Sequence, residues 1–343
     1  MKPTILVTGG TGYIGSHTVV ELMQEGYGVI IVDDLSNSDI HVLDGIEKIT
    51  GRRPQFEKFD LCNEKRVMKF FRDHTGASAI IHFAAHKAVG ESVNKPLKYY
   101  RNNLLSLIHL LQGMEEHGIP HMVFSSSCTV YGQPERLPVT EDAPVQKPGS
   151  PYGNTKKISE EILYDFIQAC RGKNCISLRY FNPIGAHPSA HIGELPPGVP
   201  DNLVPYITQT AIGLRKELLV FGHDYDTPDG TAIRDYLHVV DLARAHVAAI
   251  ARLLEGRNTL PFEVFNLGTG HGYSVLEVIQ SFERVSGVKL NYRFTGRRAG
   301  DIEKVWADAS LANRELGWVA VKSLDEAMLS AWNWEQQLRK KKP

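Results

Sequence analysis

The sequence predicts an α/β protein with a doubly wound parallel sheet and a smaller α/β region toward the C-terminus. First, short β-branched apolar runs alternate with segments whose apolar residues recur at helical spacing, a pattern typical of a parallel sheet covered by helices on both faces. Second, the first apolar run leads directly into a glycine-rich turn. Third, the regular alternation ends near residue 182, where loops rich in proline and glycine begin.

Six apolar runs mark the expected strands of the sheet, at 4–7, 29–32, 56–59, 79–81, 122–124 and 176–178. Helical spacing is clearest over 14–23, 104–114 and 158–167. Beyond residue 182 we expect a helix over 203–214, a glycine- and aspartate-rich loop over 222–230, and a late strand at 264–266 that could rejoin the first sheet. The expected domains are therefore 1–181, completed by a later strand near 233–270, and 182–343.

Composition excludes several classes of function. The chain of 343 residues has 38 Lys+Arg against 39 Asp+Glu, so its net charge of -1 supplies no field for binding nucleic acid or an anionic membrane. No uncharged apolar run approaches the roughly 18 residues of a membrane span. Four cysteines without paired spacing argue against a zinc site or a disulfide framework. We expect a cytoplasmic protein that acts on a small molecule and holds no metal.

The glycine-rich turn reads Thr-Gly-Gly-Thr-Gly-Tyr-Ile-Gly over residues 8–15, and a helical pattern begins within it. Glycine here lets backbone N–H groups approach a pyrophosphate at the positive end of the helix dipole. The triplet alone is weak evidence, and a plain tight turn is the alternative. Its place between strand and helix favours a dinucleotide-binding (Rossmann) domain in residues 1–181.

An acidic residue ends the second expected strand. Asp33 lies about 20 residues after the glycines, where a carboxylate accepts hydrogen bonds from an adenosine ribose. The same carboxylate would repel the 2′-phosphate of NADP, so we expect NAD as the cofactor. Asp60, at the end of the third apolar run, is placed to face the adenine. Each aspartate also has a simpler interpretation, as a turn residue or a helix cap.

A tyrosine and a lysine four residues apart form the candidate catalytic pair. Their segment predicts a helix, with Ser150 as N-cap and Pro151 in the first turn. Tyr152 and Lys156 then share one face, where the ammonium lowers the pKa of the phenol so that it can act as a base. Ser127 follows the fifth expected strand and is placed to bond a substrate hydroxyl. Serines after strands often only satisfy turn backbone, and the spacing alone proves nothing.

Together these motifs resemble the extended short-chain dehydrogenase/reductases, and among them the sugar-nucleotide epimerases. The resemblance covers nearly the whole chain, through VTGGTGYIGSHT, IIHFAAHKAVGESV, FSSSCTVYG, SPYGNTK, LRYFNPIGAHPS and FGHDYDTPDGTAIRDYLHVVDLA. It implies Tyr152 as the catalytic base, with Lys156 beside it and Ser127 bridging to the sugar 4-hydroxyl. It also implies a homodimer through helices at 97–114 and 152–169, whose apolar stripes could equally be plain core.

The resemblance further implies two sets of binding residues. The NAD contacts would be Gly9, Gly12, Tyr13, Ile14, Gly15, Asp33, Asp34, Asn37, Asp60, Leu61, Phe83, Ala84, Ala85, Lys87, Asn102 and Tyr180. The contacts to the UDP-sugar would be Lys87, Ser127, Phe181, Asn182, Asn202, Leu203, Phe221, Arg234, Arg298, Asp301 and Val305. Two arginines in the second region of a nearly neutral chain suit a diphosphate, although a single arginine is more often a surface residue.

The implied reaction is the reversible epimerisation of UDP-glucose and UDP-galactose at C4, through a 4-keto sugar and with recycled NAD. Val305 matches a position at which tyrosine closes the pocket beside the sugar 2-substituent, so UDP-GlcNAc and UDP-GalNAc are also expected substrates. A UDP-pentose 4-epimerase stays open as an alternative. A nucleotide-sugar dehydratase or decarboxylase should carry an acid beside the serines, where this chain has Cys128 and Thr129. A non-catalytic NAD-sensing protein would be free to lose Tyr152 and Lys156.

Overall fold

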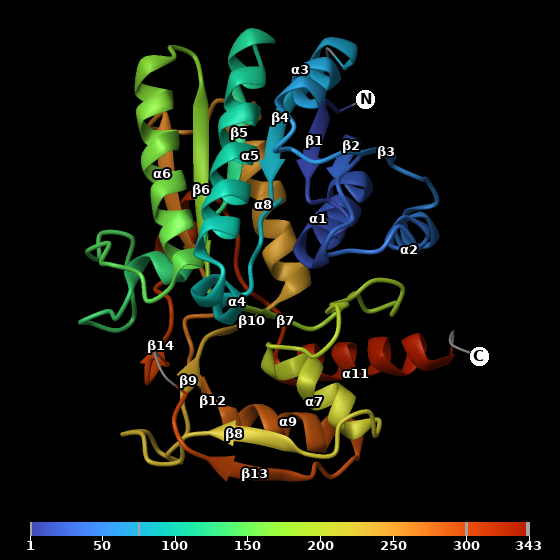
Figure 1. The fold of residues 1–343 in the computed structure, drawn as a ribbon, viewed down its shortest axis with the longest axis vertical. Coiled ribbons are helices and arrows are strands. Elements are labelled where there is room, and N and C mark those ends of the chain that lie inside the picture. The colour runs from blue at the N-terminus through green and yellow to red at the C-terminus, as the bar shows by residue number, and fades with distance from the viewer. Residues whose placement is uncertain (1, 75, 299–300, 341–343) are drawn as a thin grey trace.

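The structure, a computed structural model, describes residues 2–74, 76–298 and 301–340. Within these ranges the main sheet has seven parallel strands in the order β11-β6-β5-β4-β1-β2-β3, which confirms the expected fold class (Figure 1). The strands are β1 (Thr4–Thr8), β2 (Gly28–Asp33), β3 (Gln55–Lys58), β4 (Ala77–His82), β5 (His121–Ser125), β6 (Asn174–Tyr180) and β11 (Phe262–Leu267).

Alternation along the strands divides the core into two layers, because successive side chains of a strand point to opposite faces of the sheet. In β1, Ile5 and Val7 pack into one layer and Leu6 into the other. The first layer is completed by α1 (Tyr13–Gln24), α2 (Val42–Thr50), α8 (Val239–Leu254) and α10 (Ser310–Glu315). The second is completed by α3 (Glu64–Asp73), α5 (Pro96–Glu116) and α6 (Pro151–Ala169).

A smaller region with its own core lies beyond the carboxyl ends of the sheet strands (Figure 1). The apolar faces of its helices pack together with Leu218, Val220 and Tyr236. Its helices are α7 (Leu203–Ala211), α9 (Val275–Ser286) and α11 (Leu324–Lys340). Its short strands are β7 (Asn182–Ile184), β8 (Leu218–Phe221), β9 (Ile233–Arg234), β10 (Tyr236–His238), β12 (Tyr273–Ser274), β13 (Tyr292–Thr295) and β14 (Lys304–Val305).

The late strand does rejoin the main sheet, since β11 pairs in parallel with β6 and Val264 lies opposite Ser177. The helix expected over 203–214 is shorter, because α7 ends at Ala211 and Gly213 has a φ of 84°. The helices α8 and α9 were not predicted. None of the helices in the described ranges is long and apolar enough to cross a membrane.

Candidate functional site

The glycine-rich turn joins β1 to α1 in a conformation that side chains would block. Gly9 has a φ of 70°, and a Cβ atom there would lie 2.7 Å from the backbone nitrogen of Ala84. At Gly15 a Cβ atom would lie 2.2 Å from the Gly9 carbonyl oxygen. Gly12 is the N-cap of α1, and no side chain of the described residues caps this helix or places an acid in its first turn. The helix N-terminus is therefore open to an anion.

Asp33 lies at the end of β2 with its carboxylate aimed back at the glycine-rich turn. Its Oδ2 accepts from the backbone N–H of Thr11 at 3.2 Å, and its Oδ1 accepts from the backbone N–H of Leu35 at 2.9 Å. The hydroxyl of Ser38 also donates to Oδ1 at 3.2 Å. These bonds fix the carboxylate beside the turn, where it remains able to accept from a ribose.

The other residues expected on the dinucleotide side lie around this edge of the sheet. Asp34 and Asn37 are exposed in the loop after β2, and Asp60 follows β3 with its Oδ1 accepting from the backbone N–H of Cys62 at 2.7 Å. Leu61 is buried beside it, and its carbonyl accepts from His109 of α5 at 2.8 Å. The remaining residues follow β4 or lie on neighbouring elements: Tyr13, Ile14, Phe83, Ala84, Ala85, Lys87, Asn102 and Tyr180.

The geometry fits a bound dinucleotide. A glycine cradle that Cβ atoms would fill, an uncapped helix N-terminus and a fixed carboxylate at the end of β2 follow one another along the edge of the sheet. Pyrophosphate and adenosine ribose require these groups in this order.

The candidate base lies on α6, which begins as the sequence predicts: Pro151 is its first residue and Ser150 Oγ accepts from the backbone N–H of Gly153 at 3.2 Å. Tyr152 is only 8% exposed and hydrogen-bonds Ser127. Burial raises the pKa of Tyr152 well above its ordinary value, the nearby Tyr180 adds to this effect, and the bond to Ser127 opposes it. Phenol and serine are thus in contact at the carboxyl end of β5.

The partner of the Lys156 ammonium differs from the one that the sequence predicted. Its Nζ donates to the backbone carbonyl of Ser125 at 2.6 Å, and burial lowers its pKa to about 8. The expected depression of the Tyr152 pKa by this ammonium is not seen, because a backbone carbonyl binds the ammonium and burial dominates at the phenol. Lys156 nevertheless occupies the same helix face one turn after Tyr152.

A buried ion pair behind α6 was not predicted from the sequence. Glu160 accepts from Arg179 Nη2 at 2.6 Å and Nε at 3.0 Å, and from the hydroxyls of Ser126 at 2.6 Å and Ser177 at 2.7 Å. These bonds tie α6 to β6 and to the residue preceding Ser127. The sequence did carry one signal for this pair. Glu160 lies four residues after Lys156, a spacing that places its carboxylate on the same face of α6 as Lys156.

The substrate-side residues of the smaller region form two groups. Arg234 of β9 lies opposite Val305 of β14, and its Nη2 is 3.8 Å from Asp301 Oδ1. Val305 is 6% exposed and packs in one apolar cluster with Phe181. In the second group the guanidinium of Arg298 lies 4.5 Å from the ring centroid of Phe221, at the end of β8.

Residue Asp235 holds the backbone around the first group and was also missed. Its fully buried carboxylate accepts from the backbone N–H groups of Thr269 at 2.8 Å and Ala307 at 3.2 Å. Burial raises its pKa, against the lowering effect of the bonds from Thr269. No spacing in the sequence joins positions 235, 269 and 307, so no local signal was available.

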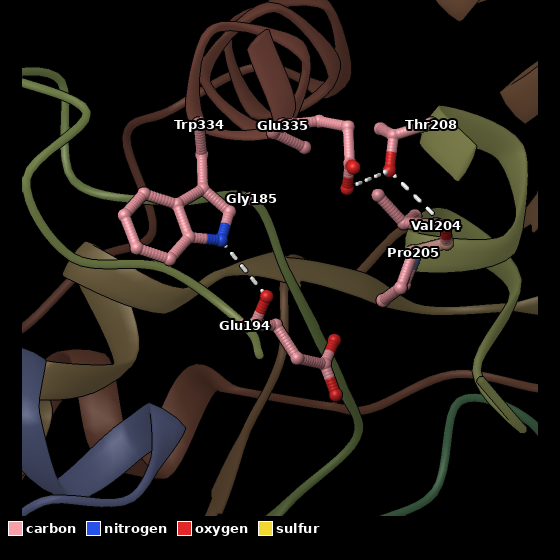
Figure 2. Close-up of a pocket in the computed structure, with 8 residues that line it drawn as sticks. Gly185, Glu194, Val204, Pro205, Thr208, Trp334 and Glu335 are labelled. Carbon is pink, nitrogen blue, oxygen red and sulfur yellow. Dashed lines mark hydrogen bonds between the residues drawn. The ribbon is translucent and has the colours of Figure 1, made fainter. Parts of the chain in front are cut away.

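The remaining expected residues meet in the segment that connects β7 to α7. Asn182 begins β7, and its backbone N–H donates to Asp235 O at 3.0 Å. Asn202 precedes Leu203, the first residue of α7, and its Nδ2 donates to Glu194 at 2.7 Å. Glu194 also accepts from Lys87 Nζ at 3.1 Å, so it joins two expected ligand-binding residues although the sequence did not single it out. Its backbone carbonyl accepts from the indole N–H of Trp334 at 2.8 Å (Figure 2).

Comparisons with known proteins agree with this geometry. The family model described as "NAD dependent epimerase/dehydratase family" matches residues 5–268. A protein of Bacillus subtilis named UDP-glucose 4-epimerase is 50% identical over 331 residues, covering 96% of each chain. A human protein of the same name is 48% identical, covering 98% of this chain and 97% of its own.

Solved structures show the same similarity. A UDP-glucose 4-epimerase from Stenotrophomonas maltophila, with bound NAD and formylated UDP-arabinopyranose, matches with a TM-score of 0.95 at 48% identity over 99% of both chains. The enzyme from Bifidobacterium longum, in complex with NAD+ and UDP, matches with a TM-score of 0.93 at 47% identity over 97% of this chain and 98% of its own. With a matching family model over most of its length, the chain belongs to the NAD dependent epimerase/dehydratase family.

Proposed function

We propose that the chain is an isomerase that interconverts UDP-glucose and UDP-galactose at C4 of the sugar, with NAD as its cofactor. The observation that carries this proposal is the buried contact between Tyr152 and Ser127 at the sheet edge that also presents the glycine-rich turn. Relatives half identical over nearly the whole chain bear the name UDP-glucose 4-epimerase, which supports the choice of substrate.

The NAD would be held by the backbone of the glycine-rich turn, by Asp33 at the adenosine ribose, and by the residues of the dinucleotide side given above. When bound, NAD supplies what the side chains lack, an acceptor that takes a hydride from C4 of the sugar and returns it to the opposite face of a 4-keto sugar. Lys87 and Lys156 bring positive charge to this side of the site.

Tyr152 moves the proton. Its Oη takes the proton of the sugar 4-hydroxyl through Ser127 when the 4-keto sugar forms, and gives it back when the hydroxyl is restored. Burial favours the neutral phenol, and positive charge beside it would bring its pKa back toward neutrality. The buried pair of Glu160 with Arg179 keeps α6 fixed during this exchange.

Inversion requires the sugar to turn while the nucleotide stays bound. Arg234 and Arg298 are proposed to bind the diphosphate, because guanidinium groups form strong bidentate bonds with phosphate. Asp301 lies 3.8 Å from Arg234 and helps to orient it. Residues 182–343 are accordingly proposed to supply most of the substrate domain, and residues 1–181 with the strand β11 the NAD-binding domain.

Val305 is proposed to set the tolerance for substituents at C2 of the sugar. It is a small, buried residue beside Arg234 in the strand register, so it leaves more room than a tyrosine would. UDP-GlcNAc and UDP-GalNAc are therefore proposed as further substrates. In a Val305→Tyr variant, kcat/KM for UDP-GalNAc should fall by about tenfold or more, and that for UDP-galactose by less than about threefold. Equal losses on both sugars would contradict this role.

We also propose that the chain forms a homodimer in the cytoplasm. The helices α5 and α6 pack against each other and carry exposed apolar side chains, with Leu97 80% and Tyr164 51% exposed. A second copy of the same helix pair would cover them. Sedimentation velocity should give about twice the mass of one chain, and a Tyr164→Lys variant should shift it toward the monomer.

Purified protein incubated with UDP-galactose tests the proposed reaction. The expected products are a mixture of UDP-galactose and UDP-glucose with no accumulation of free NADH. Stoichiometric NADH release would instead indicate a dehydrogenase, and loss of water or of carbon dioxide from the sugar a dehydratase or a decarboxylase. Parallel incubations with UDP-arabinopyranose test the pentose alternative.

A further inference from the structure

Glu194 lies in the loop between β7 and α7, and a hydrogen bond to its backbone carbonyl holds it in place. The indole N–H of Trp334, on α11, donates to the Glu194 carbonyl at 2.8 Å, while the carboxylate points away from the indole (Figure 2). The side chain of Glu194 is only 10% exposed. Its carboxylate is therefore fixed from the α11 side and has little freedom to follow a moving partner.

The carboxylate joins two segments that are far apart in the sequence. Its Oε1 accepts from Lys87 Nζ at 3.1 Å and from Asn202 Nδ2 at 2.7 Å. Lys87 follows β4 on the dinucleotide side, and Asn202 precedes α7 on the nucleotide-sugar side. A single carboxylate oxygen thus connects both halves of the proposed site.

A second contact attaches the same loop to the glycine-rich turn. The hydroxyl of Tyr13, the first residue of α1, donates to the Gly185 carbonyl at 2.6 Å. The ammonium of Lys87 lies 5.8 Å from the centroid of the Tyr13 ring. Burial, and next the charge of Glu194, raise the pKa of the Tyr13 phenol, so this phenol remains a neutral donor to the loop. The segment 185–194 is therefore fastened to the dinucleotide side at both ends.

We propose that Glu194 is a positioning residue that clasps Lys87 to Asn202 and thereby slows the release of bound NAD. The inference rests on the proposed function. Tyr13 and Lys87 belong to the side of the site proposed to bind NAD. When segment 185–194 moves away from them, the binding site for NAD opens, and the ion pair between Lys87 and Glu194 opposes this movement. Asn202 is held by the same oxygen, so substrate affinity depends on Glu194 as well.

The test compares Glu194→Gln with a matched control, Glu25→Gln. The control removes an exposed pair of the same length, 3.1 Å from Lys2, far from the site. In Glu194→Gln, NAD should dissociate about fivefold faster, as expected for one lost partly exposed pair. KM for UDP-galactose should rise about threefold while kcat changes less than twofold. Glu25→Gln should match the wild type in all three quantities.

Two further variants separate this role from a general loss of structure. Trp334→Phe keeps the charge but removes the anchoring N–H, so NAD should leave faster by a smaller factor. In a Lys87→Met background, Glu194→Gln should have less than twofold effect on NAD release, because its partner is gone.

The outcomes distinguish the two proposals. Wild-type NAD retention in Glu194→Gln, or the same fivefold effect without Lys87, would overturn the clasp. If Glu194→Gln does not fold, NAD release from Trp334→Phe decides alone, and an unchanged rate overturns the clasp. A wild-type protein that neither binds NAD nor converts UDP-galactose would instead refute the proposed function itself.

Discussion

Replacing Tyr152 by phenylalanine removes one oxygen atom from the proposed base and leaves its ring in place. The ring is buried, so Phe fills nearly the same volume and leaves no cavity. The interaction lost is the hydrogen bond with Ser127, which is worth about 1 kcal/mol of folding free energy. Stability should therefore change little, and the purified variant should still carry NAD.

The effect on catalysis should be much larger than the effect on stability. General acid–base catalysis by a positioned side chain contributes about 10²- to 10⁴-fold to a rate, which corresponds to about 2.7 to 5.4 kcal/mol of activation free energy. In Tyr152→Phe we expect kcat to fall by that factor. KM for UDP-galactose should change less than about threefold, because the phenol does not hold the diphosphate.

The assay follows formation of UDP-glucose from UDP-galactose across the neutral pH range. Burial raises the pKa of Tyr152, so the wild-type rate should rise with pH as the phenolate fraction grows, and the residual rate of Tyr152→Phe should not. Tyr292→Phe, at an exposed tyrosine of β13, serves as the control. A Tyr152→Phe variant with more than about a third of wild-type kcat would refute the role of the phenol.

Three further predictions concern Lys156, the glycine-rich turn and the buried ion pair of Glu160. Burial lowers the pKa of Lys156 to about 8, so its charge is largely present at pH 7 and largely lost at pH 9. When NAD-free protein is titrated with NAD, binding should be weaker at pH 9 than at pH 7. This difference should be smaller in Lys156→Arg. Gly15→Ala places a Cβ atom 2.2 Å from the Gly9 carbonyl, so NAD binding measured by calorimetry should fall at least about tenfold, whereas Gly90→Ala, with open space around it, should bind normally. Glu160→Gln leaves Arg179 buried without its charge partner, so urea unfolding should report a loss of about 3–5 kcal/mol, and a loss below about 1 kcal/mol would contradict the buried pair.

The sequence was sufficient to predict the parts of the fold that repeat a pattern. The strands β1, β2 and β4 and the helix α6 carry strong local signals: apolar runs, a glycine turn and a Ser-Pro helix start. The shortest strands of the smaller region, such as β9, carry none, because two residues cannot display a periodicity. Near residue 182, where β7 begins, the sequence shows only a change in loop composition.

For the site, the sequence could predict the residue types and the edge of the sheet at which they lie, but not which side chains contact each other. Tyr152 and Ser127 meet as expected because strand end and helix start are both positioned by the sheet. Lys156 does not behave as expected, since its ammonium binds the Ser125 carbonyl, a choice among rotamers that spacing does not determine. Glu194 could not be predicted from local spacing, because its partner Lys87 is 107 positions away.

The most direct test of the central claim is the fate of the hydrogen at C4 of the sugar. UDP-galactose deuterated at C4 is converted by the purified protein in ordinary water, and the UDP-glucose formed is analysed by mass spectrometry and NMR. If the same tightly held NAD takes up and returns the hydride, the product keeps its deuterium at C4 and no free NADH appears. Deuterium lost to solvent, or recovered in released NADH, would contradict the account.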